Sequence, residues 1–399
     1  MLNEISQIAP LMQDKITTIK RNNATKWLFI AEISNNKLQL YLRKKNHLYL
    51  PMKKIILPIL VLFIISCKKR DKGPDNSPVT AVKELSFDND NNSKLMFQDG
   101  ESMALLTAEA RRYEIGKVLR VKAINETTIE VANFAPVDIE DATILLTIQG
   151  SEKPIKLFKV KKIRAHGVQE IKYPFVEGTS KFLDTENKEV DLSQYKTTGL
   201  AVNKVSFDFT GETELILKLK KLAKLKWKVK YTDFDANDNT ADNWKENIDA
   251  KDVRRFSGFI INLAYLIQAN ETKTAYLAEP ITENDGVTVL TTAQKETAFQ
   301  KMIDIPQFNC GVVVNVSGLG GGYTFGVANH ILNDYLTKDV CFIVIHEVSH
   351  MIGYNHNSTM TYPKDGKGAV EACTRVYKQM LAGNEFPIKK AAYYKQSDL

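Results

Sequence analysis

Short runs of alternating apolar and polar residues fill the middle of the chain. They lie between residues 111 and 222, span five to seven residues each, and are separated by turn-forming residues. Alternation with a period of two predicts β-strands with one buried face. The predicted strands are 118–123, 128–132, 143–148, 155–160, 169–173, 204–209 and 213–219.

About seven short strands of this kind suit an immunoglobulin-like β-sandwich. We therefore predict a β-sandwich domain over residues 111–222. Its composition leaves open whether it is a spacer, a substrate-binding module or a prodomain that assists folding. The lone His166 in this region is predicted to be a surface residue and not a ligand.

From about residue 223 the pattern becomes a mixture of strand-like and helix-like segments. An apolar run without a breaker, residues 338–345, predicts a buried helix with Thr337 or Asp339 as its N-cap. Together these segments predict a second, α+β domain over residues 223–399. The other predicted elements are a strand at 225–231, a helix at 252–269 and a buried strand at 312–316.

The apolar run leads into the most specific chemical signal in the chain. It reads H-E-x-x-H-x-x-G-x-x-H, with His346, Glu347, His350, Gly353 and His356 at the fixed positions. On a helix the first two histidines lie one turn apart on one face, so both can bind one Zn²⁺ at roughly 2.0–2.1 Å. Gly353 permits the left-handed backbone that ends a helix, and His356 then returns as third ligand. Three protein ligands leave a fourth position open, which is typical of catalytic zinc.

Glu347 supplies this predicted site with a general base. It lies beside the first histidine, where it can hold a zinc-bound water and take its proton. Two simpler interpretations remain open. The histidines could be surface residues that meet by coincidence, or the zinc site could belong to a protein that no longer cleaves peptides.

The motif resembles the zinc-binding sequence of the metzincin metallopeptidases. Ser358, Met360 and Tyr362 follow it and look like the Met-turn of that family. The resemblance implies that Met360 forms an apolar floor under the histidines and that Tyr362 ligates zinc or stabilises the oxyanion. Core filling by Met360 and a solvated position for Tyr362 are the alternatives. Only three residues separate His356 from Met360, fewer than in familiar metzincins.

A glycine-rich segment, residues 318–327, precedes the predicted zinc helix. It is no dinucleotide fingerprint, because no G-x-G-x-x-G register fits. In metzincins an edge strand at this place pairs with extended substrate, so the resemblance implies a substrate-binding edge strand at Tyr323, Thr324 and Phe325. Glycines would let another backbone approach closely. A flexible loop is the alternative.

The N-terminal part carries the pattern of a bacterial lipoprotein leader. Met52 and two lysines precede eleven apolar residues, 55–65, which are too few for a typical membrane span. The leader ends at Cys67 in a sequence that resembles a lipobox, which implies a lipid anchor on Cys67. We expect Met52 to be the true start and residues 1–51 to be an over-extended reading frame. A signal anchor is the alternative, and residues 68–110 are predicted to be a polar tether.

The net charge of the chain, +7, belongs to this leader region. Of the 54 Lys and Arg and 47 Asp and Glu in the chain, ten and three lie in residues 1–67, so 44 of each sign remain in residues 68–399. A balanced mature chain without a basic stripe predicts no nucleic-acid partner.

Three further cysteines and one acidic loop are the other features that could carry a site. In an oxidising envelope, one pair among Cys310, Cys341 and Cys373 could form a disulfide and leave one thiol, with Cys373 on a predicted C-terminal helix. None is spaced as a zinc ligand. The loop 233–244 begins like a calcium loop but lacks its glycine and final glutamate, so a solvated acidic loop is favoured. One Zn²⁺ is the only expected cofactor.

These features predict an α+β lipoprotein with an immunoglobulin-like sandwich and a metzincin-like zincin domain. The expected function is a lipid-anchored, zinc-dependent endopeptidase of the bacterial cell envelope. It would hydrolyse peptide bonds of proteins or glycoproteins, with Glu347 and Tyr362 as catalytic residues. The alternatives are a non-catalytic surface binding or adhesion lipoprotein with a zinc-stabilised domain, and zinc-dependent hydrolysis of a non-peptide substrate. The oligomeric state is left open.

We expect Cys67→Ser to block lipidation, because the cysteine sulfur is the atom to which the lipid would be attached. Metabolic labelling with a radioactive fatty acid should mark the wild type and leave the variant as an unprocessed precursor. Cys310→Ser is the matched control and should label normally. Normal labelling of Cys67→Ser would contradict the lipobox interpretation.

Overall fold

The computed structural model describes residues 16–21, 27–34, 37–44, 47–51, 81–87, 94–234 and 242–399. The chain forms two compact units, residues 1–77 and 78–399, each described here by itself. The predicted leader with Met52 and Cys67 lies outside the described residues, so the leader and the over-extended start remain predictions. In the first unit, four antiparallel strands pair in chain order: β1 (Ile16–Arg21), β2 (Trp27–Ser34), β3 (Lys37–Lys44) and β4 (His47–Pro51).

The second unit begins with two sheets, called here the paired sheets. One has the order β14-β13-β11-β10-β15 with β5 beside β11, and the other has the order β6-β12-β9-β8. Strand β8 of one packs beside β15 of the other. Their strands are β5 (Glu84–Leu85), β6 (Lys94–Leu95), β8 (Leu119–Ala123), β9 (Thr128–Asn133), β10 (Ile139–Ile148), β11 (Ile155–Ile163), β12 (Gly167–Lys172), β13 (Lys181–Asp184), β14 (Glu189–Asp191) and β15 (Val205–Thr210).

Six of the seven strands predicted in this region overlap observed strands, and the seventh prediction is wrong. Residues 213–219 belong to the helix α3 (Glu214–Lys221), whose N-cap Thr213 accepts a hydrogen bond from the backbone of Ile216. Glu214 pairs with Lys218 one turn later at 2.5 Å. Leu, Lys and Glu favour helices, and the buried Ile216 and Leu219 stand three residues apart. The helical spacing therefore outweighs the short apparent alternation.

A third sheet, the short helix α2 (Met103–Leu106) and six further α-helices belong to the rest of the described part of this unit. The sheet order is β18-β19-β17-β16-β7, in which β16, β17 and β19 are parallel. The strands are β7 (Tyr113–Glu114), β16 (Lys228–Tyr231), β17 (Gln307–Val313), β18 (Gly318–Gly321) and β19 (Thr324–Ala328). The helices are α4 (Ala250–Gln268), α5 (Asn270–Ala278), α6 (Thr292–Ile303), α7 (Asn329–Asp334), α8 (Cys341–Met351) and α9 (Ala369–Ala382).

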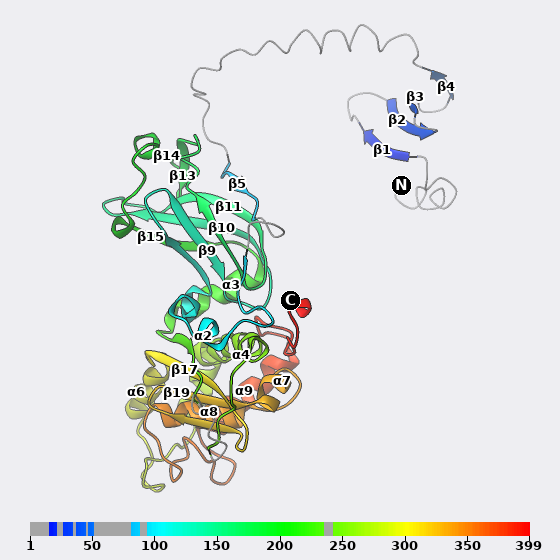
Figure 1. The fold of residues 1–399 in the computed structure, drawn as a ribbon. Helices are drawn as coiled ribbons and strands as arrows, with labels where there is room; N and C mark the ends of the chain where they lie inside the picture. Colours follow the sequence, from blue (N-terminus) through cyan, green and yellow to red (C-terminus); the bar gives the residue numbers. More distant parts are fainter. Residues whose placement is uncertain are drawn as a thin grey trace. The chain divides into compact units, whose positions relative to one another are not determined.

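The second unit is thus α+β, as predicted. The predicted helix at 252–269 is α4, and the predicted strand at 225–231 contains β16. The predicted strand at 312–316 is displaced, because β17 ends at Val313 and a bend follows. Figure 1 shows α4 in the middle of the unit, with the paired sheets on one side and the third sheet with α6 to α9 on the other.

Arg254 on α4 ties distant parts of the unit together. The side chain is fully buried and donates hydrogen bonds to the carbonyls of Phe97, Tyr393 and Tyr394. It also pairs with Asp99 at 2.6 Å. A buried guanidinium is tolerated only when its donors are satisfied, and here they hold the start and the end of the unit to one helix.

His166 is buried and is not the surface residue that we predicted. It lies in the left-handed region at φ 49° after β11, and its ring packs edge-on against Phe97 with 5.1 Å between centroids. Burial, with smaller contributions from the nearby positive charges of Arg254 and Arg111, lowers the pKa of His166 to about 3. Apolar surroundings thus make this histidine a neutral core residue.

The three described cysteines carry no disulfide. Cys310, Cys341 and Cys373 are all free and buried, so the disulfide that the sequence left possible is not formed. Burial raises the pKa of each thiol. Each thiol packs in the core as a small apolar group.

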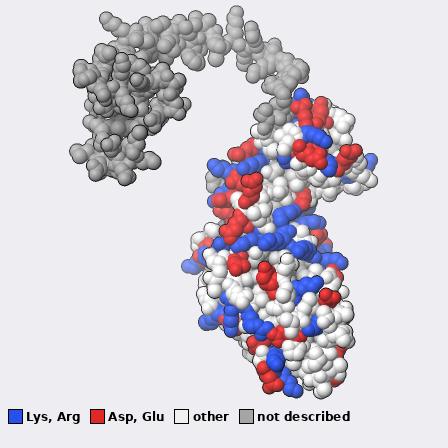
Figure 2. Space-filling view, turned by 180° about the vertical axis from the view of Figure 1, so that it is seen from behind, with Lys and Arg blue, Asp and Glu red and all other residues white. Residues whose placement is uncertain are grey.

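The surface shown in Figure 2 carries charges of both signs. Lys and Arg are intermixed with Asp and Glu on this face. Residues 235–241 of the acidic loop lie outside the described residues. At the borders of this loop, Phe234 stacks on Trp244 with 4.2 Å between the ring centroids.

Among the helices of the described residues, none has the length and apolar character needed to cross a bilayer.

The buried His166 should make the unfolding free energy depend on pH. Its folded pKa of about 3 lies below the value of about 6.5 expected for the unfolded chain, so only the unfolded chain takes up this proton between those values. The contribution is fully present above pH 6.5, and stability should fall below it by up to about 1.4 kcal/mol per pH unit. Denaturant unfolding from pH 7 to 5 should show a smaller slope for His166→Asn, since asparagine tolerates the left-handed backbone. The exposed control His330→Asn should keep the wild-type slope, and an unchanged slope in His166→Asn would contradict the argument.

Candidate metal centre

Helix α8 carries the first half of the motif into the core. Its apolar residues Cys341, Val344, Ile345 and Val348 are buried. The predicted N-caps are wrong, because the helix begins after Val340 without a side-chain cap. Thr337 instead bonds to the Asp334 carbonyl, and Asp339 pairs with Lys378 on α9 at 2.9 Å.

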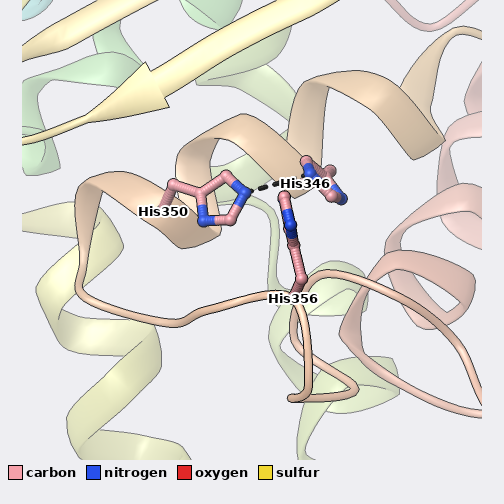
Figure 3. A group of neighbouring side chains, drawn as sticks. All are labelled: His346, His350 and His356. Carbon is pink, nitrogen blue, oxygen red and sulfur yellow. Dashed lines mark hydrogen bonds between the residues drawn. The ribbon is translucent and has the colours of Figure 1, made fainter. Parts of the chain in front are cut away.

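Backbone carbonyls orient the two histidines of α8. His346 Nδ1 lies 3.0 Å from the Thr361 carbonyl oxygen, and His350 Nδ1 lies 2.7 Å from that of Tyr354. A carbonyl can only accept, so both Nδ1 atoms donate and both Nε2 atoms keep a free lone pair. These Nε2 atoms face each other at 3.0 Å (Figure 3). Two facing lone pairs favour a shared cation, and two ligands of a tetrahedral zinc lie about 3.3 Å apart.

His356 completes the group from the loop beyond α8. Gly353 has φ +98°, as the left-handed turn at the end of the helix requires. The His356 ring centroid lies 5.2 Å from that of His346 and 4.7 Å from that of His350. The candidate ligand atoms of the three residues all lie within 4.8 Å of one another, so this group could hold a metal ion.

The electrostatics of the helical pair suit a metal. Burial lowers the pKa of His346 and of His350, so both remain neutral at neutral pH. The neutral imidazole is the form that binds metal. The exposure of the group increases from the buried His346 through His350 to the exposed His356, which leaves one side open to solvent.

Glu347 lies against the glycine-rich strand β18. Its side chain is only 6% exposed, and burial raises its pKa to about 7 despite a hydrogen bond from the Gly320 backbone. A Cβ on Gly318 would come within 2.5 Å of Glu347 Oε1, and a Cβ on Gly320 would come within 2.3 Å of the Glu347 carbonyl oxygen. These alternate glycines therefore let β18 pack directly on α8 beside the carboxyl group.

The structure places the sheet edge earlier than we predicted. The edge strand is β18 at 318–321, and Thr324 and Phe325 belong to β19, the second strand. Tyr323 lies in the intervening turn and is 52% exposed. Phe325 is fully buried, as expected for a large apolar residue on a strand with a neighbouring strand on each side. The glycines are therefore part of an ordered edge strand, and the flexible-loop alternative is wrong as well.

Of the predicted Met-turn residues, Tyr362 lies beside the histidine rings and Met360 is buried next to α5. Met360 is fully buried, and its sulfur accepts a hydrogen bond from the Tyr276 hydroxyl of α5 at 3.2 Å. The Tyr362 ring lies 4.6 Å from that of His346 and 5.3 Å from that of His356, and it is 46% exposed. The short connection after His356 is thus long enough to bring Tyr362 to the histidines.

Several residues that support the three histidines were not predicted from the sequence. Ser349 occupies a variable position of the motif, and its hydroxyl lies 2.9 Å from the Met360 carbonyl oxygen. Asn284 and Thr282 contact the loop around His356 from about 70 residues away. No local pattern marks such residues, because only the fold brings them to the motif.

We expect Gly320→Ala to destabilise the protein by about 3 kcal/mol, because its Cβ would collide with the backbone at Glu347. Gly322→Ala is the control. A Cβ there meets nothing within 4 Å, and only its left-handed backbone at φ +56° is strained, which costs about 1 kcal/mol. Denaturant unfolding measures both. Equal stability of Gly320→Ala and wild type would contradict the close packing of β18 on α8.

Comparison with known proteins identifies no relative of this chain. No protein-family model, curated protein or solved structure matches this chain. The case for the centre is therefore made by its own residues.

Proposed function

We propose that this protein is a zinc-dependent endopeptidase of the metzincin type, held to the bacterial cell envelope by a lipid on Cys67. The observation that carries the proposal is the convergence of three histidines beside a buried glutamate with a pKa of about 7. Zinc is the proposed ion because three imidazole ligands with an open fourth position are typical of catalytic zinc. In the same proposal, the paired sheets form an immunoglobulin-like sandwich, and the third sheet with its helices forms a metzincin-like domain.

Glu347 is the proposed general base. Zinc, when bound, would polarise the scissile carbonyl and acidify a water molecule. Glu347 would take a proton from that water and pass it to the leaving amine, and a pKa near 7 suits both transfers at neutral pH. Burial against β18 holds the carboxyl group in place and keeps it poorly solvated.

Tyr362 is proposed to stabilise the developing oxyanion. Its ring stands next to those of His346 and His356, and nearly half of its surface is exposed. A hydroxyl at the open side of the group can donate to an oxygen that becomes negatively charged during the reaction.

Strand β18 is the proposed docking edge for an extended peptide. It is the outermost strand of the third sheet, and its outer edge has no partner strand among the described residues. Since Gly318 and Gly320 lie against Glu347, a peptide added along this edge would pass close to the base. This placement favours a peptide bond in a protein or glycoprotein over a non-peptide substrate.

The proposal is tested by Glu347→Gln, which keeps the volume of the side chain against β18 and removes its basicity. The wild type should bind about one equivalent of zinc and cleave members of an unbiased peptide library. The variant should retain the zinc but lose roughly 10²–10⁴-fold in rate.

Two further variants complete this test. His350→Ala should lose the zinc, and the exposed Glu385→Gln should behave as wild type. Undiminished cleavage by Glu347→Gln would refute the assigned base. A wild type that binds zinc and cleaves nothing would favour the non-catalytic surface lipoprotein.

A further inference from the structure

A hairpin outside the motif forms hydrogen bonds with the segment that carries the third histidine. We call it the 281–290 hairpin. Thr282 and Val289 form its bridge, and backbone hydrogen bonds join Leu290 to Ile281 at 2.8 Å and Glu283 to Thr288 at 2.7 Å. At its tip, Asp285 Oδ1 accepts hydrogen bonds from the backbones of Val287 and Thr288, each at 2.9 Å. The hairpin is thus braced by its own contacts.

Asn284 joins this hairpin to the turn between His350 and His356. Its Nδ2 donates to the Gly353 carbonyl at 3.0 Å, and its Oδ1 accepts from the Asn355 backbone at 2.8 Å. Both ends of one amide side chain are therefore used on the chain reversal that leads to His356. Gly286 approaches the same loop so closely that a Cβ would lie 2.8 Å from the Asn357 carbonyl oxygen.

Thr282 holds the far side of His356. Its backbone donates to Thr359 Oγ1 at 2.8 Å, and its own Oγ1 accepts from the Thr359 backbone at 3.0 Å. Ser358 Oγ donates to the Thr282 carbonyl at 2.6 Å. The hairpin therefore holds the chain on both sides of the third histidine.

His356 depends on this support more than the other two ligands do. The rings of His346 and His350 are each oriented by a backbone carbonyl. The His356 ring has no hydrogen bond to any of the described residues, and it is exposed. Its position is therefore set by the path of its backbone, which the hairpin holds on both sides of the residue.

We propose that Asn284 is a positioning residue for His356, which sets how well the third imidazole reaches the metal. The inference rests on the metal centre proposed above. Partners that orient ligands typically change metal affinity 10–100-fold when they are removed. Asn284 touches neither the metal ligands' rings nor the proposed base, so its effect should be on affinity for the ion.

The test compares zinc affinities, measured by competition with a chelating dye, for the full chain. Asn284→Ala should bind zinc 10–100-fold more weakly than wild type, while the melting temperature of the metal-free protein changes no more than in Asn125→Ala. Asn125 is a matched control, because it is an exposed asparagine that holds a turn through the Thr127 backbone at 2.9 Å, within the paired sheets. Asn125→Ala should keep the wild-type zinc affinity.

Two more variants make the result specific. Asn284→Asp keeps the acceptor for Asn355 and replaces the donor to Gly353 with a carboxylate oxygen, which the Gly353 carbonyl repels. Its added negative charge would by itself favour a cation. Weaker zinc binding by this variant must then come from the lost attachment to Gly353, and it carries the test if Asn284→Ala fails to fold. In a His356→Ala background, Asn284→Ala should add a smaller loss than in the wild type, because the ligand that it chiefly positions is gone.

The outcomes separate this inference from the function on which it rests. Wild-type zinc affinity in both Asn284 variants, or an equal loss with and without His356, would overturn the positioning role alone. Absence of zinc from the wild type would overturn the metal centre itself. Zinc binding without peptide cleavage would leave the role of Asn284 intact and contradict only the proposed activity.

Discussion

An imidazole presents a free lone pair from only one nitrogen when its other nitrogen is protonated, and this constraint underlies the whole centre. The carbonyls of Tyr354 and Thr361 engage Nδ1 of His350 and His346 and so turn both Nε2 atoms inward. Both carbonyls belong to the same short segment that carries His356. One stretch of chain therefore orients two ligands and supplies the third, and a displacement of it would disturb all three at once.

Such a segment needs support from outside, because a run of about eight residues cannot fix its own path. The described contacts provide it from three sides: Ser349 on α8, Tyr276 on α5 and the 281–290 hairpin. The geometry of the candidate metal centre thus depends on elements that are distant in sequence. Burial of Met360 and Ser358 at the centre of these contacts also explains how so short a connection after His356 holds its shape.

The sequence was informative wherever chemistry is local. The spacing of His346, His350 and His356 predicted the cluster, and the helical pattern over residues 252–269 predicted α4. Predictions from the sequence were wrong where the tertiary surroundings of a residue determine its structure. Alternation over 213–219 looked like a strand, but the N-cap and the i, i+4 ion pair make it helical. The burial of His166 depends on residues that come together only in the fold. The edge strand was misplaced because the role of Gly318 and Gly320 is visible only when α8 lies against them.

The pairing of β7 with β16 has a consequence for the chain as a whole. Residues 113–114 precede most of the paired sheets in sequence, yet they complete the sheet on which the candidate metal centre is built. In terms of chain topology, most of the paired sheets are an insertion within the part that carries the three histidines and not a module joined to its front. A cut near residue 223 would remove β7 and leave β16 as a bare, pairing-competent edge. It would also remove Phe97 and Asp99, two of the partners that satisfy the buried Arg254. Evolution or engineering could therefore enlarge or replace the inserted part more easily than it could detach it.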